Sequence, residues 1–198
     1  GLVGSEMCIR DRPVRDTAWT KAGYFGLKLT QVSLSSWSAG GESALAFDSQ
    51  ITYSADFKRD RQLWQNRLEL GYGLTKNDGK SARKTNDKIY FASTYGYQIY
   101  KTLYWSALLN FNTQFAKGYD YNIEDSDFIS KFMAPGYLMI GTGVTWSPNK
   151  IFTATFTPAS WRGTIVADSR LSDEGAFGVD KGKHLLSEFG ANLKAEAV

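Results

Sequence analysis

The sequence predicts an all-β protein, and specifically an antiparallel up-and-down transmembrane β-barrel, of which this chain is an incomplete fragment of about eight strands. The first observation is the alternation of apolar and polar residues at 45–57 and 64–75, because side chains along a strand point to opposite faces. The second is the length of these stretches: about ten residues suit a tilted strand that crosses a bilayer, whereas an ordinary strand has about five or six. The third is the aromatic content of 15%, which favours strands and membrane interfaces.

The two alternating stretches form one hairpin, around which the rest of the chain is organised. Ile51 and Phe57 belong to the apolar face of its first strand, and the interleaved residues are small or polar. A charged turn at residues 58–62 leads into the second strand, where Leu68 and Leu70 continue the apolar face. We therefore expect two long strands with one face toward lipid.

The same alternation predicts the other strands. They are expected at residues 23–34, 88–99, 105–114, 137–146, 152–156 and 188–195. In the first of these the apolar parity changes after Leu29, so we expect a β-bulge or a bend near Gln31. Segments rich in Gly, Ser, Asp or charged residues predict the connections, at residues 35–42, 76–87, 116–131, 147–150 and 157–183, with a minimal turn near Lys101.

The predicted connections alternate in length, and aromatic residues accompany the short ones. Short turns follow the second, fourth and sixth strands, and long loops follow the third, fifth and seventh. Transmembrane barrels have short periplasmic turns and longer outer loops, so this alternation assigns an orientation. The aromatic residues that flank the short turns on the apolar face predict an interfacial girdle. They are Phe57, Trp64, Tyr97, Trp105, Trp146 and Phe152.

The opposite face of the strands predicts the lining of the barrel interior. The lumen-facing candidates are Asp48, Gln50, Arg67, Glu69, Lys88, Asn110, Asn112 and Gln114. Charges removed from water need partners, so we favour a salt-bridge network that braces the wall as the interpretation of the charged ones. The alternative is a selectivity lining for a pore, and the number of strands decides whether a channel is open.

Bulk composition argues against several classes of protein. The net charge is only +3, and no basic stripe interleaved with aromatic residues suggests a nucleic-acid partner. No stretch of the sequence approaches the roughly 18 uninterrupted apolar residues of a membrane helix. The mean hydropathy of −0.34 fits a soluble protein or a barrel, because half of each barrel strand faces a polar interior. Cys8 is the only cysteine, so neither a disulfide nor a cysteine metal site is expected.

The N-terminal segment differs from the rest of the chain. Its opening, GLVGSEMCIRDR, resembles a translated sequencing-adapter artefact of metagenomic DNA, and residues 13–21 show no periodicity. We therefore expect residues 1–22 to be non-native or disordered, and residues 23–198 to form a single outer-membrane β-barrel domain that is truncated at its C-terminus.

Few residues point to catalysis or to a bound cofactor. His184 is the only histidine, and a hydrolase needs a nucleophile, a base and an orienting group together, so we interpret His184 as a polar residue at the outer rim. The acidic segment 120–127 carries oxygen ligands suited to Ca²⁺ but not the EF-hand order, which favours a solvated loop. The Gly-rich segment 37–42 has no phosphate-loop lysine. We predict no catalytic, cofactor-binding or metal-binding residues.

Several ordered motifs resemble a known family. They are QVSLSSWSAGGE at 31–42, RKTNDKIYFASTYGYQ at 83–98, NFNTQFAKGYDY at 110–121, APGYLMIGTGV at 134–144 and GAFGVDKGK at 175–183. Over residues 23–195 the chain is similar to an uncharacterised, domain-of-unknown-function family of Bacteroidota-type outer-membrane β-barrels. The resemblance implies a Gram-negative outer-membrane location and a barrel that continues for several strands, with no activity to carry over. We therefore expect this chain to be a fragment without its signal peptide and closing strands.

These observations favour a non-enzymatic outer-membrane protein, which would be a pore, a transport component or a structural scaffold. Its expected partners are outer-membrane lipid and, at the loops, a protein or a small solute, and no cofactor is expected. One alternative is a membrane-embedded enzyme acting on lipid or peptide, with loop carboxylates such as Asp125 or Asp168. The other is a soluble, lipocalin-like ligand-binding barrel whose apolar face points inward.

Overall fold

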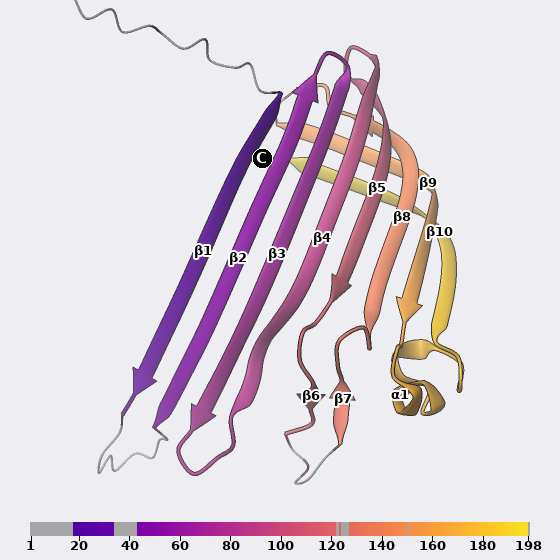
Figure 1. Cartoon of the computed structure of the whole chain (residues 1–198). Coiled ribbons are helices and arrows are strands. Elements are labelled where there is room, and N and C mark those ends of the chain that lie inside the picture. Colours follow the sequence, from indigo (N-terminus) through magenta and orange to yellow (C-terminus); the bar gives the residue numbers. More distant parts are fainter. Residues whose placement is uncertain (1–17, 34–42, 122, 124–126, 150, 198) are drawn as a thin grey trace, which may run out of the picture.

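The computed structural model describes residues 18–197, except 34–42, 122, 124–126 and 150 (Figure 1). Its main element is an eight-stranded sheet. The strands of this sheet are β1 (Trp19–Val32), β2 (Ala44–Arg59), β3 (Gln62–Asn77), β4 (Arg83–Tyr100), β5 (Leu103–Thr113), β8 (Gly136–Trp146), β9 (Phe152–Ile165) and β10 (Leu185–Ala197). Beside it lie a two-stranded ribbon and a cap, formed by β6 (Gly118–Tyr119), β7 (Phe128–Ser130), α1 (Ser169–Asp173) and the 3-10 helix η1 (Ala176–Gly178).

The strands of the large sheet follow one another in chain order, and every neighbouring pair is antiparallel. The prediction of an all-β, antiparallel up-and-down arrangement is therefore confirmed. In Figure 1, β1 to β4 run side by side, while β8 to β10 bend and pass behind them near the top of the view. Within the described part of the chain the sheet is curled but open, with β1 and β10 as its edges, so the predicted closure is not observed.

The connections alternate in length, as the sequence predicts. At one end of the sheet, Asp60 and Arg61 join β2 to β3, and Lys101 and Thr102 join β4 to β5. Asp60 has a φ of 52°, a left-handed conformation that a short polar side chain tolerates. At the other end, the connection after β5 contains β6 and β7, and the one after β9 contains α1 and η1. The loop expected at 76–87 is shortened to 78–82, because β3 and β4 extend into it.

The first strand differs from the prediction at both ends. It begins at Trp19, so residues 19–22 belong to the sheet. It pairs with β2 without a register shift from Trp19 to Val32, so the bulge expected near Gln31 is not present. The apolar parity changes at Val32 because the strand ends there.

A β-bulge in β9 accounts for the largest difference between prediction and structure. The sequence predicts a loop from residue 157, but β9 continues to Ile165. Val144 pairs with Phe156 whereas Thr142 pairs with Ala159, so β9 carries one extra residue at Thr157–Pro158. An extra residue reverses the parity of the apolar side chains, and proline, which donates no hydrogen bond, is tolerated at a bulge. The apolar residues therefore move from even to odd positions after the bulge. In the sequence, the original alternation stops at residue 156.

A small core lies at the long-loop end, under the α1–η1 cap. It is formed by buried Ala134, Val166, Leu171 and Val179, with Phe128 and Leu186 packed against it. Helix α1 begins after Asp168, whose side chain accepts the Leu171 N–H at 3.0 Å as an N-cap. The cap is the part of the described chain that has the core of an ordinary globular protein. The helices of the described chain are too short or too polar to span a membrane.

Candidate functional site

One face of the large sheet is apolar and exposed in the described part of the chain. The strand register places Phe25, Ile51, Leu70 and Ile89 side by side across β1 to β4. Phe25 is 65% exposed, and Phe189 on β10 is 83% exposed. Burying one such side chain contributes about 1.5–3 kcal/mol. A contiguous apolar face of this extent is typical of a surface that meets an apolar partner.

The other face of the sheet is the enclosed one, and it is polar. Buried strand residues gather on it, including Gly71, Gly96, Ser106 and Thr157. Hydroxyl groups pair there between adjacent strands: the Ser106 and Thr145 oxygens are 2.8 Å apart. An ordinary soluble domain buries its apolar side chains, so the two faces have the reverse of the usual distribution.

Three of the charged lumen candidates form one ion-paired group on the polar face. Glu69 on β3 accepts a hydrogen bond from Arg67 Nε at 2.6 Å and pairs on its other side with the Lys88 ammonium on β4. Lys88 also lies 5.0 Å from the centre of the Tyr90 ring. The Glu69 side chain is 15% exposed, whereas those of Arg67 and Lys88 are about half exposed, at 57% and 46%. One carboxylate therefore binds two cations, as an internal wall brace would.

The other lumen candidates lie on the same face but outside this group. Asp48 accepts a hydrogen bond from the Asn86 amide at 3.1 Å. Gln50 lies opposite Gly71 in the register. Asn110 and Asn112 continue the face on β5. Gln114 follows the end of β5, and its amide donates to the Lys131 carbonyl at 3.2 Å, so it belongs to the long-loop end.

A row of side chains crosses all eight strands of the polar face. Glu69 and Asn112 are predicted lumen residues, but the row as a whole is not predicted. The register aligns Tyr24, Thr52, Glu69, Tyr90, Asn112, Tyr137, Thr164 and Leu186. Beside it, the Arg162 guanidinium lies 5.5 Å from the Tyr137 ring centre and 4.0 Å from the Glu188 carboxylate. Three of the strands of this row carry a tyrosine at the same level. Alternation of single strands could identify each face, but only the register shows the row.

The predicted aromatic girdle residues lie at the short-turn end of the sheet. Phe57 pairs with Trp64, and Tyr97 pairs with Trp105. The rings of Trp146 and Phe152 are 5.8 Å apart, edge to face. Trp19, which lies before the expected first strand, packs against Phe57 and Trp64 with ring centres 5.2 and 5.7 Å away. The aromatic girdle therefore includes Trp19, which was expected to belong to the N-terminal segment.

Charged residues hold the long connections at the opposite end. The Phe128 ring of β7 lies within 4.7 Å of Lys117 Nζ and 4.5 Å of the Arg170 guanidinium. Lys131 Nζ is 2.5 Å from the Asp168 carboxylate. The Lys131 ammonium and the Leu171 N–H hold the pKa of Asp168 below its ordinary value. These contacts attach the α1 cap to the β7 ribbon.

The residues considered for an enzyme are not assembled into a catalytic group in the described chain. His184 Nδ1 is 2.7 Å from the Val166 carbonyl oxygen, within the backbone pairing at the start of β10. Asp168 is already engaged by Lys131 and the α1 N-terminus. Asp125 lies outside the described residues, as does the whole of the Gly-rich segment at 37–42. No cluster of three possible metal ligands occurs among the residues that were placed.

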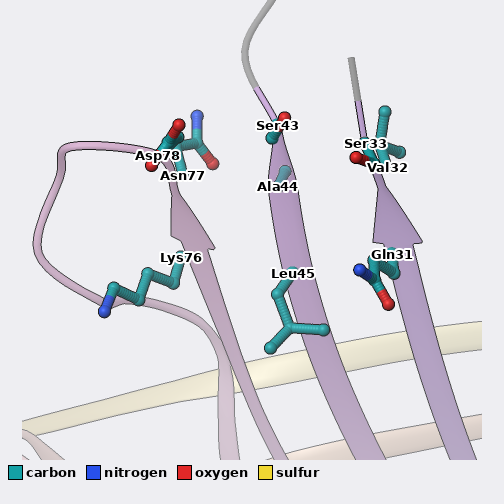
Figure 2. A pocket seen from close by; sticks show the side chains of 9 residues that line it. All are labelled: Gln31, Val32, Ser33, Ser43, Ala44, Leu45, Lys76, Asn77 and Asp78. Atoms are coloured by element: carbon teal, nitrogen blue, oxygen red, sulfur yellow. The ribbon is translucent and has the colours of Figure 1, made fainter. Parts of the chain in front are cut away.

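A cavity of about 270 Å³ opens between the ends of β1, β2 and β3 (Figure 2). Gln31, Leu45 and Lys76 line it from three adjacent strands, and Asn77 and Asp78 lie at its far rim. Asp78 N–H donates to the Ser43 carbonyl at 2.8 Å, which ties the rim together. The cavity is a gap between strand ends, and its lining includes no histidine or cysteine.

Comparison with known proteins concerns the first half of the sheet. A family model described as "Protein of unknown function (DUF3078)" matches residues 29–119. No curated protein and no solved structure matches the chain. The expected resemblance covers residues 23–195, so the matched segment is shorter. It includes the Arg67–Glu69–Lys88 group and part of the aromatic girdle, and its similarity is to a family whose function is unknown.

Proposed function

We propose that the chain forms part of the wall of an outer-membrane β-barrel, with its apolar face in lipid and its polar face toward the interior. The observation that carries this proposal is the distribution of exposure. Large apolar side chains such as Ile140 and Phe156 are about half exposed, at 46% and 50%, while the polar face holds the buried and ion-paired groups. Lipid-facing and lumen-facing residues alternate in this way along barrel strands.

The dimensions of the apolar face support a bilayer environment. On β3 the apolar residues run from Trp64 in the girdle to Leu74, near the long-loop end. Ten residue steps span roughly 34 Å along a strand. At a tilt of about 40°, this corresponds to roughly 26 Å along the membrane normal, close to the apolar band of barrel proteins, which is about 25 Å tall. Charged Lys76 follows Leu74 on the same face of β3 and lies beyond this band, as expected for the headgroup region.

Barrel closure is part of the proposal. The outer edges of β1 and β10 carry backbone N–H and C=O groups that would each cost several kcal/mol if left unpaired in hydrocarbon. The two edge strands run in opposite directions, as antiparallel closure requires. We propose that these edges pair with each other or with further strands.

The specific role we propose is non-enzymatic: a pore, a transport component or a scaffold. The polar face presents braced ion pairs, and the candidate catalytic groups His184 and Asp168 are engaged in structural contacts. A membrane-embedded enzyme is the second candidate, carried by the loop carboxylates. Hydrolysis of lipid or peptide that is lost on replacing Asp125, Asp168 or His184 would favour it.

The placement in a membrane is tested by reconstitution. The chain is refolded from denaturant in detergent, mixed with phospholipid and floated on a density gradient, followed by an alkaline carbonate wash. We expect it to float with the vesicles and to resist the wash. Recovery as a soluble monomer without detergent would contradict the proposal and favour the lipocalin-like alternative. Conductance in planar bilayers then distinguishes a pore from a scaffold.

A further inference from the structure

A groove interrupts the apolar face between β5 and β10. Its volume is about 750 Å³, within the range of roughly 300–1,000 Å³ that is usual for ligand sites. The apolar-face residues that line it are Ala107, Ile140, Thr142, Ala159, Trp161 and Phe189. The lining combines small side chains with the larger ones of Ile140, Trp161 and Phe189.

The bulge in β9 is the structural origin of the groove. The extra residue at Thr157–Pro158 interrupts the regular pairing of β9 with β8, and Pro158 itself lines the groove. Gly143 on β8 permits the bulge, because a Cβ there would lie closer than 3.0 Å to the backbone of Phe156 and Thr157. The Trp161 indole lies over Gly163, where a Cβ would meet the ring, and therefore extends away from Ala159. The backbone of β8 and β9 therefore determines the shape of the groove, and few flexible side chains contribute to it.

The two hydroxyl groups of the lining already form hydrogen bonds. Ser160 Oγ donates to the Gly190 carbonyl at 2.7 Å, and Thr142 Oγ1 donates to the Ser106 carbonyl at 3.2 Å. The lining contains no charged residue. An occupant therefore finds a mainly apolar surface without charge, which suits a hydrocarbon chain.

We propose that this groove binds one acyl chain of a phospholipid, held more tightly than the lipid that surrounds the rest of the wall. The inference rests on the proposed membrane placement. Ala107 and Thr142 lie one step of the apolar face from girdle residue Trp105 and its partner Val144, so the groove adjoins the girdle at the short-turn end. In the proposed orientation this end is periplasmic, and a phospholipid of the leaflet on that side would supply the chain.

The test uses tryptophan fluorescence in vesicles with increasing fractions of phosphatidylcholine brominated on its acyl chains. Two variants of the full chain each keep one of the six tryptophans, Trp161 in the groove or Trp64 on the open face, with phenylalanine at the others. We expect half-maximal quenching of Trp161 at a brominated-lipid fraction about tenfold lower than for Trp64, as a site with selective affinity requires. The depth of a tryptophan in the bilayer affects how much of its fluorescence is quenched. Comparing the lipid fractions at half-maximal quenching removes this effect.

Filling the groove provides the matched control. Ala159→Leu should remove the difference between Trp161 and Trp64, and Ala55→Leu, which adds the same bulk to the apolar face on β2, should preserve it. If Ala159→Leu prevents folding, Ala107→Leu fills the groove from β5. Equal half-quenching fractions at both tryptophans would overturn the acyl-chain site while leaving the membrane wall intact. Absence of quenching at both would overturn the membrane placement and the groove site together.

Discussion

The Asp87 carboxylate on β4 accepts the backbone N–H of Phe115 at 2.7 Å, just beyond the end of β5. Its second oxygen accepts the N–H of Ala116 at 2.9 Å and the Lys84 ammonium at 2.6 Å. The side chain of Asp87 is 3% exposed and that of Lys84 is 13% exposed. One carboxylate therefore fixes the point at which the chain leaves the sheet and enters its longest connection.

Replacement of Asp87 by alanine should destabilise the fold strongly. It leaves Lys84 nearly buried without a carboxylate, and two backbone donors without an acceptor, at an expected cost of about 3 kcal/mol. Urea unfolding in detergent, followed by tryptophan fluorescence, measures this change. Asp78→Ala, in an exposed turn nearby, is the control and should change stability by less than about 0.5 kcal/mol. Equal stability of the two variants would contradict the role of Asp87.

An arginine at Leu70 tests which face meets lipid. Leu70 lies between Ile51 and Ile89 on the apolar face, near mid-height. Arginine at the bilayer midplane of a barrel costs roughly 2–4 kcal/mol. Asn112→Arg, on the polar face, should be tolerated. Reversible unfolding in lipid vesicles compares the two variants, and a larger loss for Asn112→Arg would place lipid on the opposite face.

Gly143→Ala should distort the bulge on which the groove depends. A Cβ at this position meets backbone atoms that cannot rotate away, so we expect a loss of about 1–3 kcal/mol. The matched control is Gly190→Ala on β10, where a Cβ has no atom within 4 Å. That change should be neutral or slightly stabilising, because it lowers the entropy of the unfolded chain. If the unfolding midpoints of both variants fell equally, the strands would tolerate no alanine in place of glycine, whatever the space around it.

Acid should loosen the α1 cap. The folded-state pKa of Asp168 is depressed by Lys131 and the Leu171 N–H, so its contribution is complete above the ordinary carboxyl pKa. That contribution is lost as the pH falls through the depressed value, below about pH 4. Hydrogen exchange at the Leu171 amide measures it. Asp168→Asn keeps the N-cap oxygen but not the ion pair. In this variant the opening free energy at the Leu171 amide should fall by about 1 kcal/mol, so the amide should exchange faster. Its exchange should also lose the pH dependence. A variant that retains the acid response would assign that response to another group.

Much of the fold follows from the period of the side chains. The hairpin of β2 and β3 keeps one parity throughout, so alternation of single residues is enough to predict its faces and its turn. The same rule fails in β9, because the bulge at Thr157–Pro158 reverses the parity and imitates a loop. The alternation rule also fails to assign Trp19 to a strand, because this residue lies close to a polar segment with no period. Its ring contacts with Phe57 and Trp64 place it in the girdle.

The candidate site was less predictable than the strands. Sequence alternation places Arg67, Glu69 and Lys88 on one face, but the pairing register is needed to bring Lys88 beside Glu69. The Asp87 contact with Phe115 depends on where β5 ends, which composition does not determine. The groove depends on the bulge, whose position is visible only through the partners of β8 and β10.

The even number of strands in the described sheet has a practical consequence for testing the proposed placement in a membrane. Trp19 pairs with Phe57 and Ala197 pairs with Phe152, so both ends of the sheet emerge beside the short turns. Any tag fused at either end would share a compartment with the turn at Asp60. A label in the 174–183 segment, beyond α1, would lie in the other. Thiol reagents that cannot cross the envelope, applied to single cysteines at these two kinds of position, would therefore report opposite accessibility and establish which end of the wall faces outward.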